Sequence, residues 1–390
     1  MPIDIERVLE ILKRLVGFDT TSRNSNMEIA DYIETYLASF GVKCQRFDYV
    51  PGSKTNLYAT IGPTDRGGVL LSGHTDVVPV DGQNWSTDPF ELVQIGDRLF
   101  GRGTCDMKGF LAVVLAAVPL FVSANLKTPV HLAFSCDEEV GCRGVVPMID
   151  GIAHLDVVAK AAIVGEPSNM SVINAHKGTM TFVTDVVGAE AHSSAPLAGV
   201  NAISYAARLI VEMEACAKDL RDMGDHTGLF DPPYSTLHVG LISGGTVKNI
   251  VPGHCRITWE IRPLPGVDMA PVIQRIEEKS AALASEMQAT SPMTSVVTTR
   301  VNVVPGLIND GRNLAEEVAL RAAGSNNVAA VSYTTEGGLF RGAGIPTVIC
   351  GPGSIAQAHK PDEYIEINEL RRCMAFMERL CALCEDGSLT

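Results

Sequence analysis

The sequence predicts an α/β protein with a mostly parallel central sheet, helices on both faces of that sheet, and an inserted second domain of ferredoxin-like type. Apolar strands first alternate with helical segments, the order then changes to βαββαβ, and the α/β alternation resumes near the C-terminus. The length of 390 residues exceeds the roughly 250 to 300 residues that one hydrophobic core organises. Two domains are therefore expected.

The first domain begins with amphipathic helices, since apolar residues recur at helical spacing with charged residues between them. Its expected elements are helices at 4–17 and 26–40, extended segments at 42–49 and 56–61, a strand at 69–72, a helix at 106–123, a strand at 130–136, a helix at 138–149 and a strand at 161–164. The apolar run 110–122 is shorter than the ~20 residues that span a membrane. We expect it to be a buried helix, with no membrane as partner.

The second domain is predicted at 178–304, where the pattern changes. Its expected elements are a strand at 179–188, a helix at 202–220, strands at 235–242 and 254–262, a helix at 269–287 and a strand at 295–304. A helix at 312–323 and a strand at 347–350 then return to the first pattern. The first domain should therefore consist of 1–177 and 305–390.

The charge balance argues against a nucleic-acid partner. There are 31 Lys and Arg against 45 Asp and Glu, a formal net charge of −14, and no basic run is present. The ten cysteines show no regular spacing, which fits reduced thiols better than a disulfide framework. Because the N-terminus also lacks a cleavable signal pattern, we expect a cytoplasmic protein.

Histidines and carboxylates follow four of the apolar strands. In an open α/β sheet the ligand crevice lies beyond the carboxyl ends of the strands, so these side chains can converge there. They are His74 and Asp76 after strand 69–72, Glu138 and Glu139 after strand 130–136, Glu166 after strand 161–164 and His359 after strand 347–350, joined by Asp106 just before a helix.

Two imidazoles with several carboxylates form a ligand set that suits Zn²⁺ or a similar ion. One bridging carboxylate would allow two metals. Asp76 could hold the tautomer of the His74 imidazole, since the two share a face of extended chain. Glu138 and Glu139 should point in different directions, so one can bind metal and the other can face a bound water. Each pattern alone also fits an ordinary structural role, such as acidic residues at a helix N-terminus.

The same residues lie within motifs that resemble the acetylornithine deacetylase and succinyl-diaminopimelate desuccinylase family of di-zinc amidohydrolases. The resemblance covers nearly the whole chain in order and is closest to the acetylornithine deacetylase branch. The motifs are SGHTDVVP (72–79), GRGTCDMKG (101–109), DEEVG (137–141), GEPS (165–168), AHKG (175–178), AHSSAPLAGVNAI (191–203), IRPLPG (261–266) and GPGSIAQAHKPDEYIE (351–366).

The resemblance implies a zinc-peptidase-like catalytic domain with two Zn²⁺ per chain, for which Co²⁺ can substitute. It implies that Asp106 bridges the metals, with His74 and Glu166 at one site and Glu139 and His359 at the other. Glu138 would be the general acid/base and Asp76 the residue that orients His74. The inserted domain would act as a lid and form a homodimer. His192 would stabilise the oxyanion, and Arg262 and Asn249 would bind the substrate carboxylate.

The expected reaction is deacylation of an N-acyl amino acid, with N2-acetyl-L-ornithine giving L-ornithine and acetate in arginine biosynthesis. Succinyl-diaminopimelate, acetylcitrulline, another acylamino acid or a dipeptide stay open as substrates. Glu336 is a candidate for the ornithine ammonium because it precedes the His359 segment.

Two rival functions are weighed against this one. The first is a nucleotide-dependent oxidoreductase with a dinucleotide-binding loop at 351–356. It is disfavoured because such a loop must begin a helix, and Pro361 would cut that helix short. The second, a catalytically silent binding protein, is disfavoured because no candidate ligand is missing.

Overall fold

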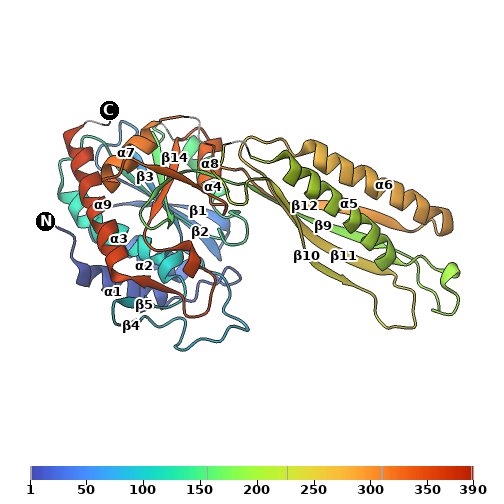
Figure 1. The fold of residues 1–390 in the computed structure, drawn as a ribbon. Coiled ribbons are helices and arrows are strands. Elements are labelled where there is room, and N and C mark those ends of the chain that lie inside the picture. The colour runs from blue at the N-terminus through green and yellow to red at the C-terminus, as the bar shows by residue number, and fades with distance from the viewer. Residues whose placement is uncertain (1, 156, 226, 309–310, 388, 390) are drawn as a thin grey trace. The chain divides into compact units, whose positions relative to one another are not determined.

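The structure is a computed structural model that describes residues 2–155, 157–225, 227–308, 311–387 and 389. The chain forms two compact units (Figure 1). Unit 1 consists of Met1–Ala175, Leu307–Ala330 and Thr335–Thr390, and unit 2 of His176–Gly306 and Val331–Thr334. Each unit has a sheet and a hydrophobic core of its own.

Unit 1 is built on an eight-stranded sheet with the order β1-β2-β6-β3-β7-β14-β8-β13. These strands are β1 (Cys44–Val50), β2 (Lys54–Ile61), β3 (Val69–His74), β6 (Val130–Ser135), β7 (Ala161–Pro167), β8 (Val172–His176), β13 (Val328–Val331) and β14 (Thr347–Gly351). The four central strands β6, β3, β7 and β14 run parallel, while antiparallel pairs join β1 to β2, β2 to β6 and β8 to β14. The predicted sheet is confirmed, but the sequence did not reveal β8 and β13.

Helices cover both faces of this sheet. They are α1 (Ile5–Val16), α2 (Met27–Ala38), α3 (Gly109–Ser123), α4 (Val146–Ala153), α7 (Leu314–Ala323), α8 (Gly337–Gly342) and α9 (Ile367–Asp386). Buried residues of α1, α2, α3, α7 and α9 share one core with alternate residues of the strands. Buried residues of α4 and α8 lie outside that core although both helices contact strands, so they cover the opposite face. A small sheet of β4 (Val93–Ile95), β5 (Arg98–Phe100) and β15 (Tyr364–Glu366) completes the unit.

The apolar helix predicted near residues 106–123 is a core element. The stretch Thr104–Ser123 is long and apolar enough to cross a membrane, yet 83% of its most apolar window is buried within the protein. Its start differs from the prediction, because α3 begins at Gly109 and Asp106 lies in a preceding turn with φ −119° and ψ 90°. Asp106 is therefore presented by irregular backbone, where its side chain is not confined to a helix face.

The helix predicted at 138–149 is wrong for residues 138–145, which is two thirds of its length. Asp137 and Cys142 have left-handed φ values of 51° and 53°, and the amides of Gly141 and Cys142 both donate to the carbonyl of Glu138. These tight turns place Glu138 in a loop, and α4 begins only at Val146.

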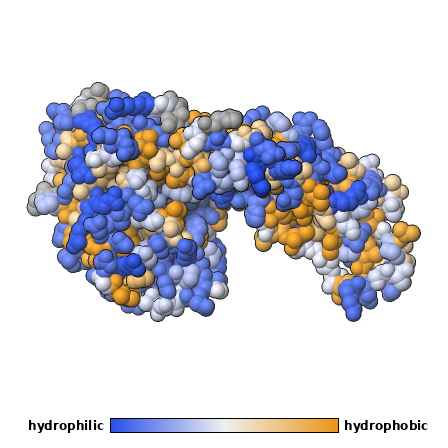
Figure 2. Space-filling model, in the orientation of Figure 1, coloured by the Kyte–Doolittle hydropathy of each residue, from blue (hydrophilic) through white to orange (hydrophobic). Residues whose placement is uncertain are grey.

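Unit 2 has the predicted βαββαβ order. Its elements are β9 (Thr179–Val187), α5 (Ala202–Met223), β10 (Thr236–Gly244), β11 (His254–Arg262), α6 (Ala270–Thr290) and β12 (Ser295–Val304). The antiparallel sheet has the order β10-β11-β9-β12, so β10 and β12 are its edges. Phe182 stacks on the buried Trp259 in the core between sheet and helices. Figure 2 shows hydrophobic groups on the surface of this unit, and Leu241 and Val297 on the edge strands are exposed.

Candidate metal centre

The five predicted metal ligands come together within unit 1. His74 ends β3 and Glu166 lies in β7, the neighbouring parallel strand. Glu139 follows β6 on the other side of β3, and His359 follows β14 beside β7. Because these strands are parallel, their carboxyl ends meet at one edge of the sheet, as the sequence predicts.

Asp106 lies between two pairs of ligands. Its Oδ1 is 3.1 Å from Nε2 of His74, which is 3.6 Å from Oε1 of Glu166. Its Oδ2 is 3.3 Å from Nε2 of His359, which is 3.0 Å from Oε2 of Glu139. Each oxygen of Asp106 thus faces one imidazole with one further carboxylate, which is the arrangement that a carboxylate bridging two cations needs.

The tautomer of His74 is fixed by main chain. Its Nδ1 lies 2.9 Å from the backbone carbonyl of Asp76 and must donate to it, so Nε2 is the nitrogen that faces Asp106 and that, when deprotonated, can bind a metal. The Asp76 carboxylate is 3.7 Å from Nδ1. The orienting role expected for that carboxylate therefore belongs to the carbonyl of the same residue.

The Asp76 carboxylate positions the acidic loop instead. Its Oδ1 accepts from the amide of Glu138 at 3.1 Å and its Oδ2 from the amide of Glu139 at 3.3 Å, while the hydroxyl of Ser22 donates to Oδ2 at 2.7 Å. Two consecutive amides bound to one carboxylate fix the main chain of both glutamates. Their side chains can then take the separate directions expected from the sequence.

The electrostatics of the cluster fit divalent cations. Asp106, Glu138 and Glu166 are each less than 10% exposed, and buried carboxylates require a partner charge. Burial raises the pKa of Glu138 to about 8, and that of Glu139 to about 7, despite the nearby histidines. Burial also raises the pKa of Glu166.

The carboxylates of the cluster also favour the positively charged forms of the two histidines. Hydrogen bonds to Asp106 and Glu139 raise the pKa of His359 to about 10. Burial alone would lower the pKa of His74, but Asp106 and Glu166 raise it. Burial disfavours ionised Asp106, yet hydrogen bonds from both histidines lower its pKa. Ligand atoms of His74, Asp106 and Glu139 lie within 4.8 Å of one another, as do those of His74, Glu138 and Glu166. This cluster could hold metal.

We expect the metal-free protein to become less stable as the pH rises from about 6 to about 9. The pKa values of Glu139, Glu138 and His359, about 7, 8 and 10, all lie above their ordinary values. The folded state therefore binds more protons than the unfolded state, and this stabilisation is lost as the pH passes each folded pKa. Cations displace these protons, so the stability of the metal-loaded protein should change less with pH. Calorimetric melting of chelated and reloaded protein checks this, and a chelated protein that melts higher at pH 9 would contradict it.

Three predicted site residues belong to unit 2. His192 and Asn249 are exposed and lie on paired segments, since the amide of Ser193 donates to the carbonyl of Asn249 at 3.0 Å. The amide of Ser194 donates to Nδ1 of His192 at 3.2 Å, so the neutral imidazole carries its proton on Nε2. Arg262 pairs with Glu260 at 2.9 Å, the surface ion pair that such a position often forms.

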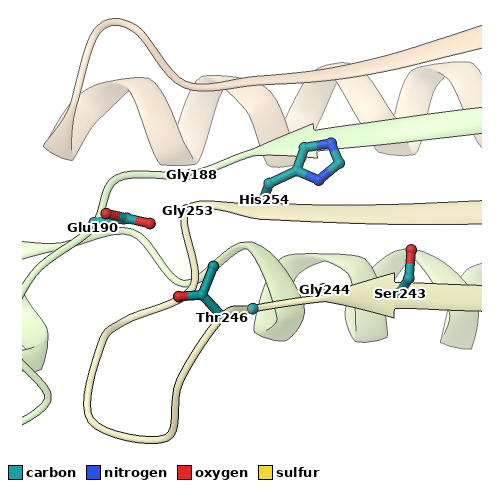
Figure 3. Close-up of a pocket in the computed structure, with 8 residues that line it drawn as sticks. Gly188, Glu190, Ser243, Gly244, Thr246, Gly253 and His254 are labelled. Carbon is teal, nitrogen blue, oxygen red and sulfur yellow. The ribbon is translucent and has the colours of Figure 1, made fainter.

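Unit 2 also has two neighbouring cavities. One of about 480 Å³ is lined by Glu190, Thr246 and His254 among four glycines (Figure 3). Nε2 of His254 is 2.9 Å from a carboxylate oxygen of Asp185. None of the predicted site residues lines this cavity. The second, of about 550 Å³, is lined by Ser193, the residue after His192. Its other lining residues lie at 196–203 and 244–252, in the segments that follow His192 and surround Asn249.

Glu336 does not have the predicted substrate-facing position. Its side chain is fully buried in unit 1. The hydroxyl of Ser72 donates to Oε1 at 2.6 Å and that of Ser135 to Oε2 at 2.8 Å, so both oxygens are bound by strands β3 and β6. Because Glu336 is fully buried and both of its oxygens accept from serine hydroxyls, it is a structural residue of unit 1.

Sequence reasoning missed the residues that hold the ligand loops. Cys142 donates its thiol to Oε1 of Glu138 at 3.2 Å. Arg102 and Glu363 form a buried ion pair at 2.7 Å, and Gln83 contacts Arg102. Arg102 and Glu363 lie inside two of the quoted motifs, which was the available signal, but spacing along the chain does not show that the motifs touch.

Known proteins resemble this chain over nearly all of its length. The chain is 35% identical over 379 residues to an acetylornithine deacetylase of Myxococcus xanthus, covering 95% of this chain and 96% of that one. An M20 family metallo-carboxypeptidase of Sulfolobus solfataricus has the same fold, with a TM-score of 0.74 at 22% identity over 97% of this chain and 99% of the other. A dinuclear metal-binding M20 peptidase of Bacillus subtilis gives a TM-score of 0.67 at 17% identity over 98% of each chain.

The model of peptidase family M20/M25/M40 matches residues 70–382, a span that includes all five predicted ligands. With the cluster of candidate metal ligands, these matches identify the chain as a metal-dependent hydrolase that belongs to peptidase family M20/M25/M40.

Proposed function

We propose that this enzyme hydrolyses the amide bond of an N-acyl amino acid, with N2-acetyl-L-ornithine as its substrate and L-ornithine and acetate as products. This reaction would place it in arginine biosynthesis in the cytoplasm. The observation that carries the chemistry is the position of Asp106 between two imidazole–carboxylate pairs. The choice of substrate rests on the deacetylase of Myxococcus xanthus, which matches over 95% of this chain.

Asp106, His74 and Glu166 would hold one Zn²⁺, and Asp106, Glu139 and His359 the other, with Co²⁺ as a functional substitute. Two such cations would polarise an amide carbonyl and lower the pKa of a bound water. Glu138 would take a proton from the attacking water and return it to the departing amine. Because burial already raises the pKa of this carboxyl, it is suited to both transfers near neutral pH.

His192 would donate from Nε2 to the carbonyl oxygen as negative charge develops there, a contribution typically worth about 3 to 4 kcal/mol. Ser194 supports this role because its amide occupies Nδ1. Asn249 and Arg262 are proposed to bind the substrate carboxylate. We also propose a homodimer through unit 2, whose edge strands expose apolar side chains (Figure 2). Light scattering of the purified protein tests the dimer.

The substrate is tested by measuring amine release from acetylornithine, acetylcitrulline, succinyl-diaminopimelate and a dipeptide side by side. The enzyme is first stripped with a chelator and then restored with Zn²⁺ or Co²⁺. We expect no turnover after stripping, recovery with either ion, and the highest kcat/KM for acetylornithine. A higher kcat/KM for another compound would overturn the substrate, and full activity of the stripped enzyme would overturn the metal chemistry.

A further inference from the structure

A short segment at residues 83–86 holds the loop that carries His359. Nε2 of Gln83 donates to the backbone carbonyl of His359 at 2.9 Å, across 276 positions of sequence. The amide and hydroxyl of Ser86 donate to the two carboxylate oxygens of Asp362 at 2.7 and 2.9 Å. The loop is therefore attached to this segment at two points.

Both attachment points have strained backbone. His359 has φ 64° and Asp362 φ 54°, in the left-handed region that residues other than glycine rarely adopt. Such conformations persist where surrounding contacts hold them. The contacts from Gln83 and Ser86 fall on these two residues, and the conformation that they hold directs the His359 imidazole at Asp106 and Glu139.

Gln83 also connects this loop to the turn that carries Asp106. Its Oε1 accepts from Arg102 at 2.6 Å and from Nε1 of Trp85 at 3.1 Å. Arg102 is paired with the buried carboxylate of Glu363, which accepts from the amides of Gly103, Cys105 and Asp106, the last at 3.0 Å. A single polar network thus links the main chain of two ligands that come from distant parts of the sequence.

The two pairs of ligands are supported differently. His74 and Glu166 lie in adjacent strands that ladder hydrogen bonds hold, and the His74 side chain is 1% exposed. His359 lies in a loop, and its side chain is 54% exposed. The site at His359 therefore depends on the loop contacts for its geometry.

We propose that Gln83 is a positioning residue for His359, and that its donation to the His359 carbonyl sets the affinity of the cation site formed with Asp106 and Glu139. This inference rests on the proposed two-cation function. Gln83 is partly exposed, so its replacement leaves the hydrophobic core intact.

The test is a Zn²⁺ titration of the chelated full-length protein against a competing chelator, read by calorimetry. Gln83→Ala removes the donor and the acceptor. Gln83→Glu keeps an acceptor for Arg102 and Trp85 but cannot donate to His359. The control is Gln94→Ala, since Gln94 is exposed and makes a local hydrogen bond to Gly96.

We expect two zinc ions to bind the natural protein and the control equally. Both Gln83 variants should bind the first zinc normally and the second about tenfold more weakly. Activity should then need more zinc, with kcat at saturating zinc close to that of the natural enzyme.

Unchanged binding in both Gln83 variants would overturn the proposal, as would equal weakening of both sites. Weakening in Gln83→Ala alone would assign the effect to Arg102 and overturn the donor role. If the natural protein itself binds fewer than two zinc ions, the two-cation function fails, and this inference fails with it.

Discussion

Replacing Asp106 by asparagine is expected to reduce metal binding from two ions per chain to at most one and to lower kcat/KM by at least about a hundredfold. The substitution keeps the shape of the side chain but leaves one oxygen, without charge, in place of two. In the natural protein, each carboxylate oxygen of Asp106 faces a different imidazole, at 3.1 and 3.3 Å. One amide oxygen cannot replace both, so at least one site loses a ligand.

Elemental analysis of dialysed protein measures the first effect and amine release the second. Asp97→Asn is the matched control, because Asp97 is an exposed residue of the same unit and should keep two metals and full activity. Thermal melting of both variants shows whether they are folded. Two tightly bound metals in folded Asp106→Asn would mean that Asp106 is not the bridge.

Convergence of the ligands could be predicted because it follows from sheet topology. His74, Glu139 and Glu166 each follow or end an apolar strand, and the carboxyl ends of neighbouring parallel strands lie at one edge. The predicted strands needed only approximate bounds for this conclusion. A long run of apolar residues indicates a buried element even where its exact ends are uncertain. The buried segments α3 and β6 could therefore be predicted from the sequence as well.

The contacts that orient the ligands could not be predicted, because they depend on main-chain groups and tight turns. The carbonyl rather than the carboxylate of Asp76 meets His74, and no sequence pattern separates the two. Apolar residues after Glu139 fit a helical period, but left-handed backbone at Cys142 delays that helix. From the sequence, Glu336 looks like an exposed loop residue because its side chain is charged. In the structure, hydrogen bonds from two serine hydroxyls allow that side chain to be buried.

The adjacent glutamates provide the sharpest test of the mechanism, because their isosteric variants should fail in opposite ways. Glu138→Gln should keep two metals and lose about 10² to 10⁴-fold in kcat, since an amide cannot accept the proton of the attacking water. Glu139→Gln should lose metal from the site at His359, because Oε2 of Glu139 lies 3.0 Å from that imidazole.

Both variants keep the amides that bind Asp76, so the main chain of the loop should be unchanged and each glutamine controls for the other. Metal content and single-turnover amine release, measured on the same preparations, separate loss of chemistry from loss of metal. The geometry leaves Glu138 near enough to His74 and Glu166 to act as a ligand. If Glu138→Gln lost metal while Glu139→Gln kept it, the two roles would have to be exchanged, and the proton acceptor would be the residue that contacts His359.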